Sequence, residues 1–218
     1  NTEWLCDCGG CHVAIVDLHE KILQVVEDIE IQKCPVLTDV KDYPEADIGI
    51  LTGSVRTEHD RHAAQEMHKK CKTIIAFGTC AVYGGLHGAG LAHTREEIMD
   101  YVYKSTPTTK TDFIPDSDIT GLEHTVTPID EVIDVDLYLP GCPPHAHYIF
   151  ESLSALVEGR EAKAGQETVC AGCKRVMQKT EVSTISNSQE GIAKDDLCFL
   201  SQGYICLGSV TLDRCLAP

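Results

Sequence analysis

Short apolar stretches alternate with longer amphipathic stretches along most of this 218-residue chain, and this alternation limits the folds open to it. The apolar stretches are typical of buried strands, and the amphipathic ones have helical spacing. The expected strands are residues 3–6, 29–37, 46–55, 72–80 and 135–142. The expected helices are residues 12–29, 57–71, 94–103 and 147–159. This order predicts an α/β fold, and our first choice is a flavodoxin-like doubly wound parallel sheet with helices on both faces.

Local signals mark the ends of several expected helices. Thr94 is a suitable N-cap, and Gly159 is a suitable end for the last helix. The helix at 57–71 has acidic residues early and lysines late, as the helix dipole favours. The polar excursion between Lys104 and Ile129 has no clear period, so we expect no regular element there.

The sequence changes character after Ala164. Residues 165–218 contain few apolar residues and five cysteines, so hydrophobic packing alone is insufficient to order them. A bound metal is the natural alternative, because metal binding can supply folding free energy. We therefore expect a flavodoxin-like domain at 1–164 and an irregular cysteine-rich, cluster-binding tail at 165–218.

The whole chain contains twelve cysteines. An even number would suit the disulfides of a secreted protein, but disulfide scaffolds are usually short and loop-rich. Clear helices and strands favour a reduced, cytoplasmic, metal-binding protein instead. No apolar stretch approaches the about 20 residues that a membrane helix needs. The net charge of −16 argues against nucleic acid and against an anionic membrane surface as partners.

Four cysteines follow the ends of expected strands. Cys8 and Cys11 follow the first strand, Cys80 ends the fourth, and Cys142 ends the fifth. The carboxyl ends of parallel strands meet at one edge of a sheet, where such folds build their sites. Four converging thiolates are the ligand set of a 4Fe–4S cluster.

Other interpretations of these cysteines remain open. A lone C-x-x-C pair is a weak signal that also suits zinc or a redox pair. Zinc sites usually draw their ligands from two short local pairs, whereas this set has one pair and two distant single residues. The remaining cysteines of this part, Cys6, Cys34 and Cys71, are expected to be buried as small apolar residues.

Three stretches, "CDCGGC", "GTCAVYGG" and "LPGCPP", resemble the ligand motifs of the small subunit of nickel–iron hydrogenases. "RTEHD", "YVY" and "QGYICLG" resemble the cytoplasmic methyl-viologen-reducing class, which in methanogens is coupled to heterodisulfide reductase. The resemblance covers nearly the whole chain. It implies that Cys8, Cys11, Cys80 and Cys142 hold the proximal 4Fe–4S cluster, and that the nickel belongs to a separate large subunit.

The same resemblance extends to the tail. It implies that Cys170, Cys173, Cys198 and Cys206 hold a distal 4Fe–4S cluster and that Cys215 is the first ligand of a medial one. The family supplies the other medial ligands from later cysteines, and the sequence stops at Pro218. We therefore expect at least two clusters, and a third completed by a longer C-terminus. A zinc ribbon is the alternative for the tail on spacing alone.

Three further features lie near the expected proximal cluster. The family commonly has Glu-Gly at the end of the third strand, where this chain has Thr52-Gly53. Glu58 is a nearby carboxylate that also suits the first turn of a helix. His12 could donate a hydrogen bond to a ligand sulfur. The glycine-rich stretch at 84–90 lacks the pattern of a phosphate loop, and we expect close backbone approach around the proximal cluster there.

Together these features predict the electron-transfer small subunit of a nickel–iron hydrogenase. Its expected partners are the large subunit and an electron-accepting iron–sulfur or flavin subunit, with heterodisulfide reductase as one link. The alternatives are an iron–sulfur subunit of a complex I-like assembly and a zinc or hydrogen-sensing protein. The complex I subunit shows adjacent cysteines at its first position, whereas Cys8 and Cys11 are separated by two residues.

Overall fold

The structure, a computed structural model, describes residues 1–26, 29–109, 113–160, 167–186, 191, 193–194 and 196–211. The chain divides into two units, Asn1–Ala164 and Gly165–Pro218. Among the described residues, every helix is too short or too polar to traverse a lipid bilayer.

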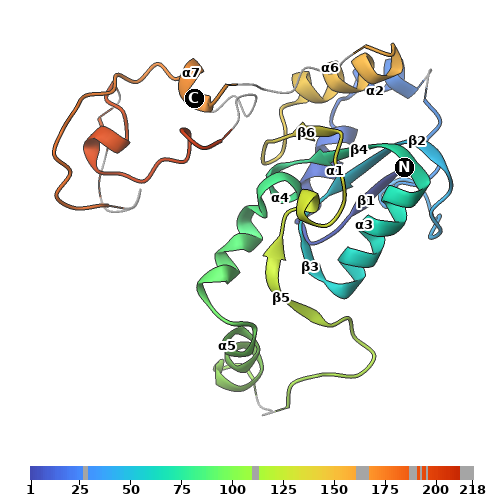
Figure 1. Cartoon of the computed structure of the whole chain (residues 1–218), viewed down its shortest axis with the longest axis horizontal. Coiled ribbons are helices and arrows are strands. Elements are labelled where there is room, and N and C mark those ends of the chain that lie inside the picture. The colour runs from blue at the N-terminus through green and yellow to red at the C-terminus, as the bar shows by residue number, and fades with distance from the viewer. Residues whose placement is uncertain are drawn as a thin grey trace. The chain divides into compact units, whose positions relative to one another are not determined.

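A parallel sheet forms the centre of the first unit (Figure 1). Its strands, in spatial order, are β1 (Thr2–Trp4), β2 (Ala46–Thr52), β4 (Cys71–Phe77) and β6 (Leu137–Leu139). All three neighbouring pairs are parallel. The expected α/β fold with a doubly wound parallel sheet is therefore confirmed.

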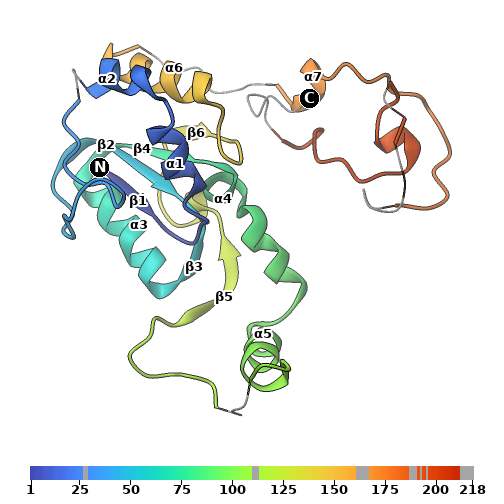
Figure 2. The same cartoon turned by 180° about the vertical axis from the view of Figure 1, so that it is seen from behind.

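Helices cover both faces of this sheet (Figures 1 and 2). One face carries α1 (Gly10–Val16), α2 (Glu20–Val26) and α6 (Ala146–Val157), and the other carries α3 (Glu58–Lys70). A hydrophobic core lies on each face of the sheet, and successive residues of a strand point to opposite cores. Ile74 packs in the core that contains α3 residues, and Ile75 packs in the core that contains α6 residues. The strands are nearly continuously apolar because both of their faces are buried.

The expected strand at 29–37 is wrong. This segment contacts β1 through a backbone hydrogen bond from the Thr2 N–H to the Lys33 carbonyl at 2.7 Å. The Cys34 N–H, however, donates to the Thr38 hydroxyl at 3.0 Å, and a turn follows at Pro35. Proline lacks the N–H that a ladder needs, so the segment lies beside β1 without becoming a strand.

The expected helix at 12–29 is two helices. His19 has a φ of 53°, in the left-handed region, and separates α1 from α2. Other helix signals are confirmed. The predicted N-cap Thr94 forms a capping box at the start of α5 (Arg95–Asp100), and Thr57, which was not predicted as a cap, forms another at the start of α3. Gly159, with a φ of 66°, follows the end of α6.

The polar excursion contains a strand that the sequence did not indicate. β5 (Leu122–Thr127) pairs antiparallel with β3 (Val55–Thr57) in a separate two-stranded sheet. The segments between β4 and β6 also form short helices, which are α4 (Thr79–Tyr83), η1 (Gly85–Ala92), a π-helical turn at Tyr101–Ser105 and η3 (Ile129–Glu131). The pairing of β3 with β5 joins residues far apart in the chain, which local periodicity cannot reveal.

The second unit is irregular, as expected. It contains α7 (Val169–Gly172), η4 (Leu200–Gln202) and two isolated bridges, Val176–Leu197 and Ser186–Tyr204. None of its described hydrophobic side chains is buried. The Arg175 guanidinium stacks on the Phe199 ring, 4.0 Å from its centre.

Candidate metal centre

The four cysteines that follow strand ends lie at one edge of the parallel sheet. Cys8 is in the loop after β1, and Cys11 is in the first turn of α1. Cys80 is in α4, directly after β4, and Cys142 follows β6. Figure 1 shows α1, α4 and β6 close to one another at this edge. The topology therefore brings together residues that are up to 134 positions apart (142 − 8).

Backbone hydrogen bonds join the loops that carry Cys80 and Cys142. The Gly78 N–H donates to the Leu139 carbonyl at 2.8 Å, and the Thr79 N–H donates to the Gly141 carbonyl at 2.7 Å. The Gly141 N–H donates in return to the Thr79 hydroxyl at 3.3 Å. These bonds fix the loop that carries Cys80 beside the loop that carries Cys142.

Glycines leave space around three of the four sulfurs. A Cβ at Gly78 would lie 2.4 Å from the Cys11 sulfur, and a Cβ at Gly85 would lie 2.4 Å from the Cys80 sulfur. A Cβ at Gly10 would lie 3.3 Å from the Cys8 sulfur. Gly78 also has a φ of 93°, which side-chain-bearing residues rarely adopt. Within the 84–90 stretch, Gly85 lies close to the Cys80 sulfur, and an approach of this stretch to a cluster stays a prediction.

The thiols act on one another electrostatically. Burial raises the pKa of Cys11 to about 12, with further contributions from Asp7 and from the thiols of Cys80, Cys8 and Cys142. Burial also raises the pKa of Cys80, against a backbone hydrogen bond and with contributions from Cys142, Asp7 and Cys8. Such thiols need a nearby positive charge to become thiolates, and bound iron supplies one.

Ligand number, ligand type and the glycine cradle all fit an iron–sulfur cube. Among the described residues, no three His, Cys, Asp or Glu side chains are arranged around one point as a single metal ion would require. In a 4Fe–4S cluster each iron takes its own thiolate, so the ligands surround a cube.

Of the other cysteines of the first unit, Cys71 lies at the opposite end of β4 from Cys80, whereas Cys6 lies near Cys80. Burial raises the pKa of Cys6, and the charge of Cys80 adds to this shift. Cys34 and Cys71 are buried, as expected. Cys6 is only half-buried, which differs from the expectation, and it pairs with Ser54 through backbone hydrogen bonds of 3.0 Å. This isolated antiparallel bridge joins the segment after β1 to the segment after β2.

His12 and Glu58 form hydrogen bonds with residues other than the four cysteines. The two nitrogens of the His12 ring contact the hydroxyls of Thr2, at 3.0 Å, and Thr52, at 3.2 Å, so the expected bond to sulfur is not observed. Glu58 lies in the first turn of α3, and its N–H donates to the Gly121 carbonyl at 3.1 Å. Sequence reasoning missed Asp7, whose carboxylate accepts from the Thr52 hydroxyl.

In the second unit, two of the predicted ligands, Cys170 and Cys206, lie close to the same glycine. A Cβ at Gly208 would lie 3.5 Å from the Cys206 sulfur and 3.8 Å from the Cys170 sulfur. Cys173 ends α7, and the Cys198 N–H donates to the Val176 carbonyl at 2.9 Å. Cys170 and Cys173 are exposed. The predicted ligand Cys215 lies outside the described residues.

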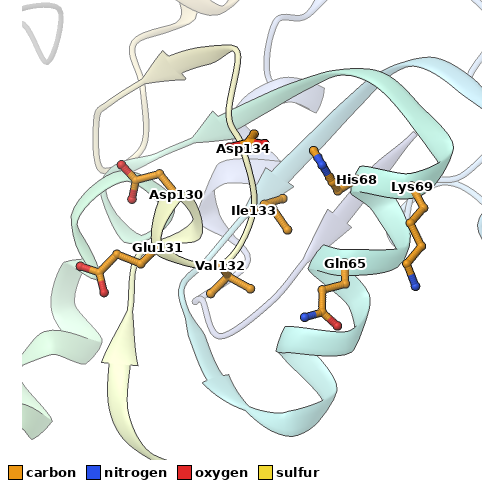
Figure 3. Close-up of a pocket in the computed structure, with 8 residues that line it drawn as sticks. All are labelled: Gln65, His68, Lys69, Asp130, Glu131, Val132, Ile133 and Asp134. Atoms are coloured by element: carbon orange, nitrogen blue, oxygen red, sulfur yellow. The ribbon is translucent and has the colours of Figure 1, made fainter.

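A separate hollow of about 540 Å³ lies between α3 and η3 (Figure 3). Charged and polar residues from both elements line it, and no cysteine does. Its lining residues are Gln65, His68, Lys69, Asp130, Glu131, Val132, Ile133 and Asp134. It is distinct from the cysteine edge of the sheet.

Comparison with known proteins identifies one matching family model. Residues 8–156 match the family described as NADH ubiquinone oxidoreductase, 20 Kd subunit. The match covers the segment that carries Cys8, Cys11, Cys80 and Cys142.

Two curated relatives match over nearly the whole chain, and both are subunits of F420-non-reducing hydrogenases. The relative from Methanocaldococcus jannaschii is 40% identical over 97% of this chain and 74% of its own length. The relative from Archaeoglobus profundus, which is named as an iron-sulfur subunit, is 37% identical over 95% of this chain and 74% of its own length.

A solved structure supports the same relationship. A chain of an NAD⁺-reducing [NiFe]-hydrogenase in the H₂-reduced state superposes with a TM-score of 0.72 and is 31% identical. The match covers 76% of this chain and 93% of that chain.

Proposed function

Because this chain belongs to the NADH ubiquinone oxidoreductase 20 Kd subunit family and is the small subunit of a nickel–iron hydrogenase, we propose that it relays electrons through 4Fe–4S clusters. The electrons would come from dihydrogen oxidised on the large subunit and leave to an acceptor protein. The observation that carries this proposal is the meeting of four cysteines at one sheet edge, with glycines around three of their sulfurs.

Cys8, Cys11, Cys80 and Cys142 would hold the proximal cluster. A bound cluster supplies one-electron chemistry that no side chain here offers. The residues of this chain contribute position and environment. Burial of Cys11 and Cys80 excludes water from one side of the site, while Cys8 and Cys142 are exposed. The backbone bonds between the Cys80 and Cys142 loops would keep the ligands in place without a metal.

Cys170, Cys173, Cys198 and Cys206 would hold a second, distal cluster. The support is that the Cys206 and Cys170 sulfurs would both lie within 4 Å of a Cβ at Gly208. Cys215 would be the first ligand of a medial cluster. A cluster in this unit would also supply the folding free energy that its exposed apolar residues cannot.

The large subunit is the first partner of such a chain. An iron–sulfur or flavin subunit, linked to heterodisulfide reductase, would take the electrons in the cytoplasm. The names of the two curated relatives state that their hydrogenases do not reduce F420. We infer the same for this chain, so its acceptor belongs to another class.

Anaerobic purification of the chain together with its large subunit tests the proposal. We expect about four irons and four sulfides per cluster and no stoichiometric zinc. Cys142→Ser should lose about four of those irons, and hydrogen-dependent reduction of an acceptor dye should fall to background. Cys34→Ser is the matched control, since Cys34 is buried away from this edge, and it should retain both properties. Stoichiometric zinc, or equal damage from both substitutions, would contradict the proposal.

A further inference from the structure

A chain of hydrogen bonds runs from β1 to the loop that carries Cys8. The His12 ring contacts the Thr2 hydroxyl through Nε2 at 3.0 Å and the Thr52 hydroxyl through Nδ1 at 3.2 Å. The Thr52 hydroxyl donates to Oδ2 of Asp7. The other oxygen, Oδ1, accepts from the Gly9 N–H at 2.5 Å. His12 and Thr52 are 1% and 0% exposed, so this chain is largely shielded from water.

Donor and acceptor roles follow from counting protons. An ionised carboxylate only accepts, so the single hydroxyl proton of Thr52 goes to Asp7. His12 must then donate to Thr52 through Nδ1. In the neutral ring with its proton on Nδ1, Nε2 accepts from the Thr2 hydroxyl. Every bond in the chain therefore points toward the Asp7 carboxylate.

This carboxylate lies within electrostatic reach of the four-cysteine edge. Asp7 directly precedes Cys8, and its carboxylate accepts from the N–H of Gly9, the residue that follows Cys8. In the part of the chain that the structure describes, no ion pair joins Asp7 to a lysine or arginine. Its charge is thus held by hydrogen bonds and is not cancelled by a neighbouring cation.

We propose that the Asp7 carboxylate lowers the reduction potential of the proximal cluster, with Thr52 and His12 as the residues that position it. This inference rests on the proposed function, because it requires a cluster at the four cysteines. A fixed negative charge nearby opposes the addition of an electron, and low dielectric surroundings strengthen that effect. Thr52, at the end of β2, acts here by orienting a carboxylate on the adjacent loop.

Redox titration of the purified two-subunit complex tests the proposal. The proximal signal is identified in the electron paramagnetic resonance spectrum as the one absent from Cys142→Ser. Asp7→Asn removes the charge and keeps the shape. Its proximal potential should rise enough to change the ratio of reduced to oxidised cluster about tenfold, which is ~59 mV for one electron. Thr52→Val should also raise the potential, but by less, because the carboxylate keeps its charge and loses one of the donors that hold it in place.

Asp17→Asn is the matched control, since it removes an equal charge from an exposed carboxylate at the far end of α1, and its potential should equal that of wild type. A wild-type potential in an iron-loaded Asp7→Asn overturns this inference alone. If Asp7→Asn loses its iron, Thr52→Val decides, and an unchanged potential there overturns the inference. A wild-type complex without a reducible cluster would overturn the proposed function and this inference with it.

Discussion

The two units of this chain bring cysteines together by different means. In Asn1–Ala164, buried side chains on both faces of a parallel sheet hold the loops that carry the cysteines. In Gly165–Pro218, no described hydrophobic side chain is buried, and apolar residues such as Ile185 and Val210 are at least 70% exposed. In the first unit, hydrophobic packing therefore positions the cysteines. In the second unit, we expect the bound cluster to supply the free energy that orders the chain.

Removal of iron should give the largest difference between the units. Anaerobic chelation should make the second unit susceptible to proteolysis while the first unit stays protected. Metal binding in small metal-ordered domains is worth about 10–16 kcal/mol, far more than the exposed side chains of this unit can replace. Limited proteolysis with mass spectrometry would locate the cuts. Cleavage of both units at equal rates would contradict the comparison.

The second-largest difference is expected from glycine-to-alanine substitutions, which should reduce the iron content at the first site but not at the second. Gly78→Ala should lose the proximal cluster, because its Cβ would lie 2.4 Å from the Cys11 sulfur and its φ of 93° costs alanine about 1–3 kcal/mol. Gly172→Ala in α7 is the matched substitution, with no atom within 4 Å of its Cβ, and it should keep all iron. Iron analysis of both variants checks this. Full iron in Gly78→Ala would show that the first site is looser than the structure indicates.

A pair of methionine substitutions compares the packing of the two units. Met67→Ala should lower the free energy of unfolding of the first unit by about 2–5 kcal/mol, because its side chain is 0% exposed and a cavity would remain. Met177→Ala removes the same atoms from a side chain that is 67% exposed, and its effect should stay within about 0.5 kcal/mol. Chemical denaturation with hydrogen exchange measures both. A large effect at Met177 would reveal a hydrophobic core in the second unit.

The smallest expected effect is a pH-dependent one in the first unit. Arg61 donates two hydrogen bonds to Glu123, at 2.6 and 2.7 Å, and holds the pKa of that carboxyl below its usual 4.5. Because the folded-state pKa is depressed, the pair stabilises the fold above pH 4.5, and this stability is lost as the pH falls through the lower value. Arg61 is 39% exposed, so the contribution should be below about 1 kcal/mol.

Glu123→Gln tests this contribution in the metal-free chain. Its unfolding free energy should fall below that of wild type at neutral pH, and the two should converge in acid. A difference that stays constant with pH would mean that the charge of Glu123 has no role. In the second unit, the stacking of Arg175 on Phe199 involves no titrating acid, so we expect no matching step there.

Much of the first unit is predictable from short-range signals. The capping boxes at Thr57 and Thr94 and the strands β2 and β4 follow from residue type and local spacing. The strand expected at 29–37 failed because Pro35 and the Thr38 hydroxyl redirect its backbone. β5 was missed because its partner, β3, lies more than 60 positions earlier in the chain (122 − 57 = 65). Local periodicity carries no information about such a distant partner.

The candidate sites also combine features that local sequence signals predict with features that depend on distant contacts. The positions of Cys8, Cys11, Cys80 and Cys142 after strand ends are enough to expect their convergence, given a parallel sheet. The partners of His12 could not be expected, because hydroxyls of Thr2 and Thr52 reach its ring only once β1 and β2 lie side by side. A sulfur atom beside it in sequence was the natural but wrong expectation.

The amino-acid order alone determined the alternation of strands and helices, the family, and the edge of the sheet where the thiols collect. These depend on hydrophobic period and on residues beside strand ends, which are local properties. Only the tertiary structure decided which strands pair outside the main sheet and that Thr52 and His12 orient Asp7. Such contacts join segments about 40 positions apart, and they form only when burial has already brought those segments together.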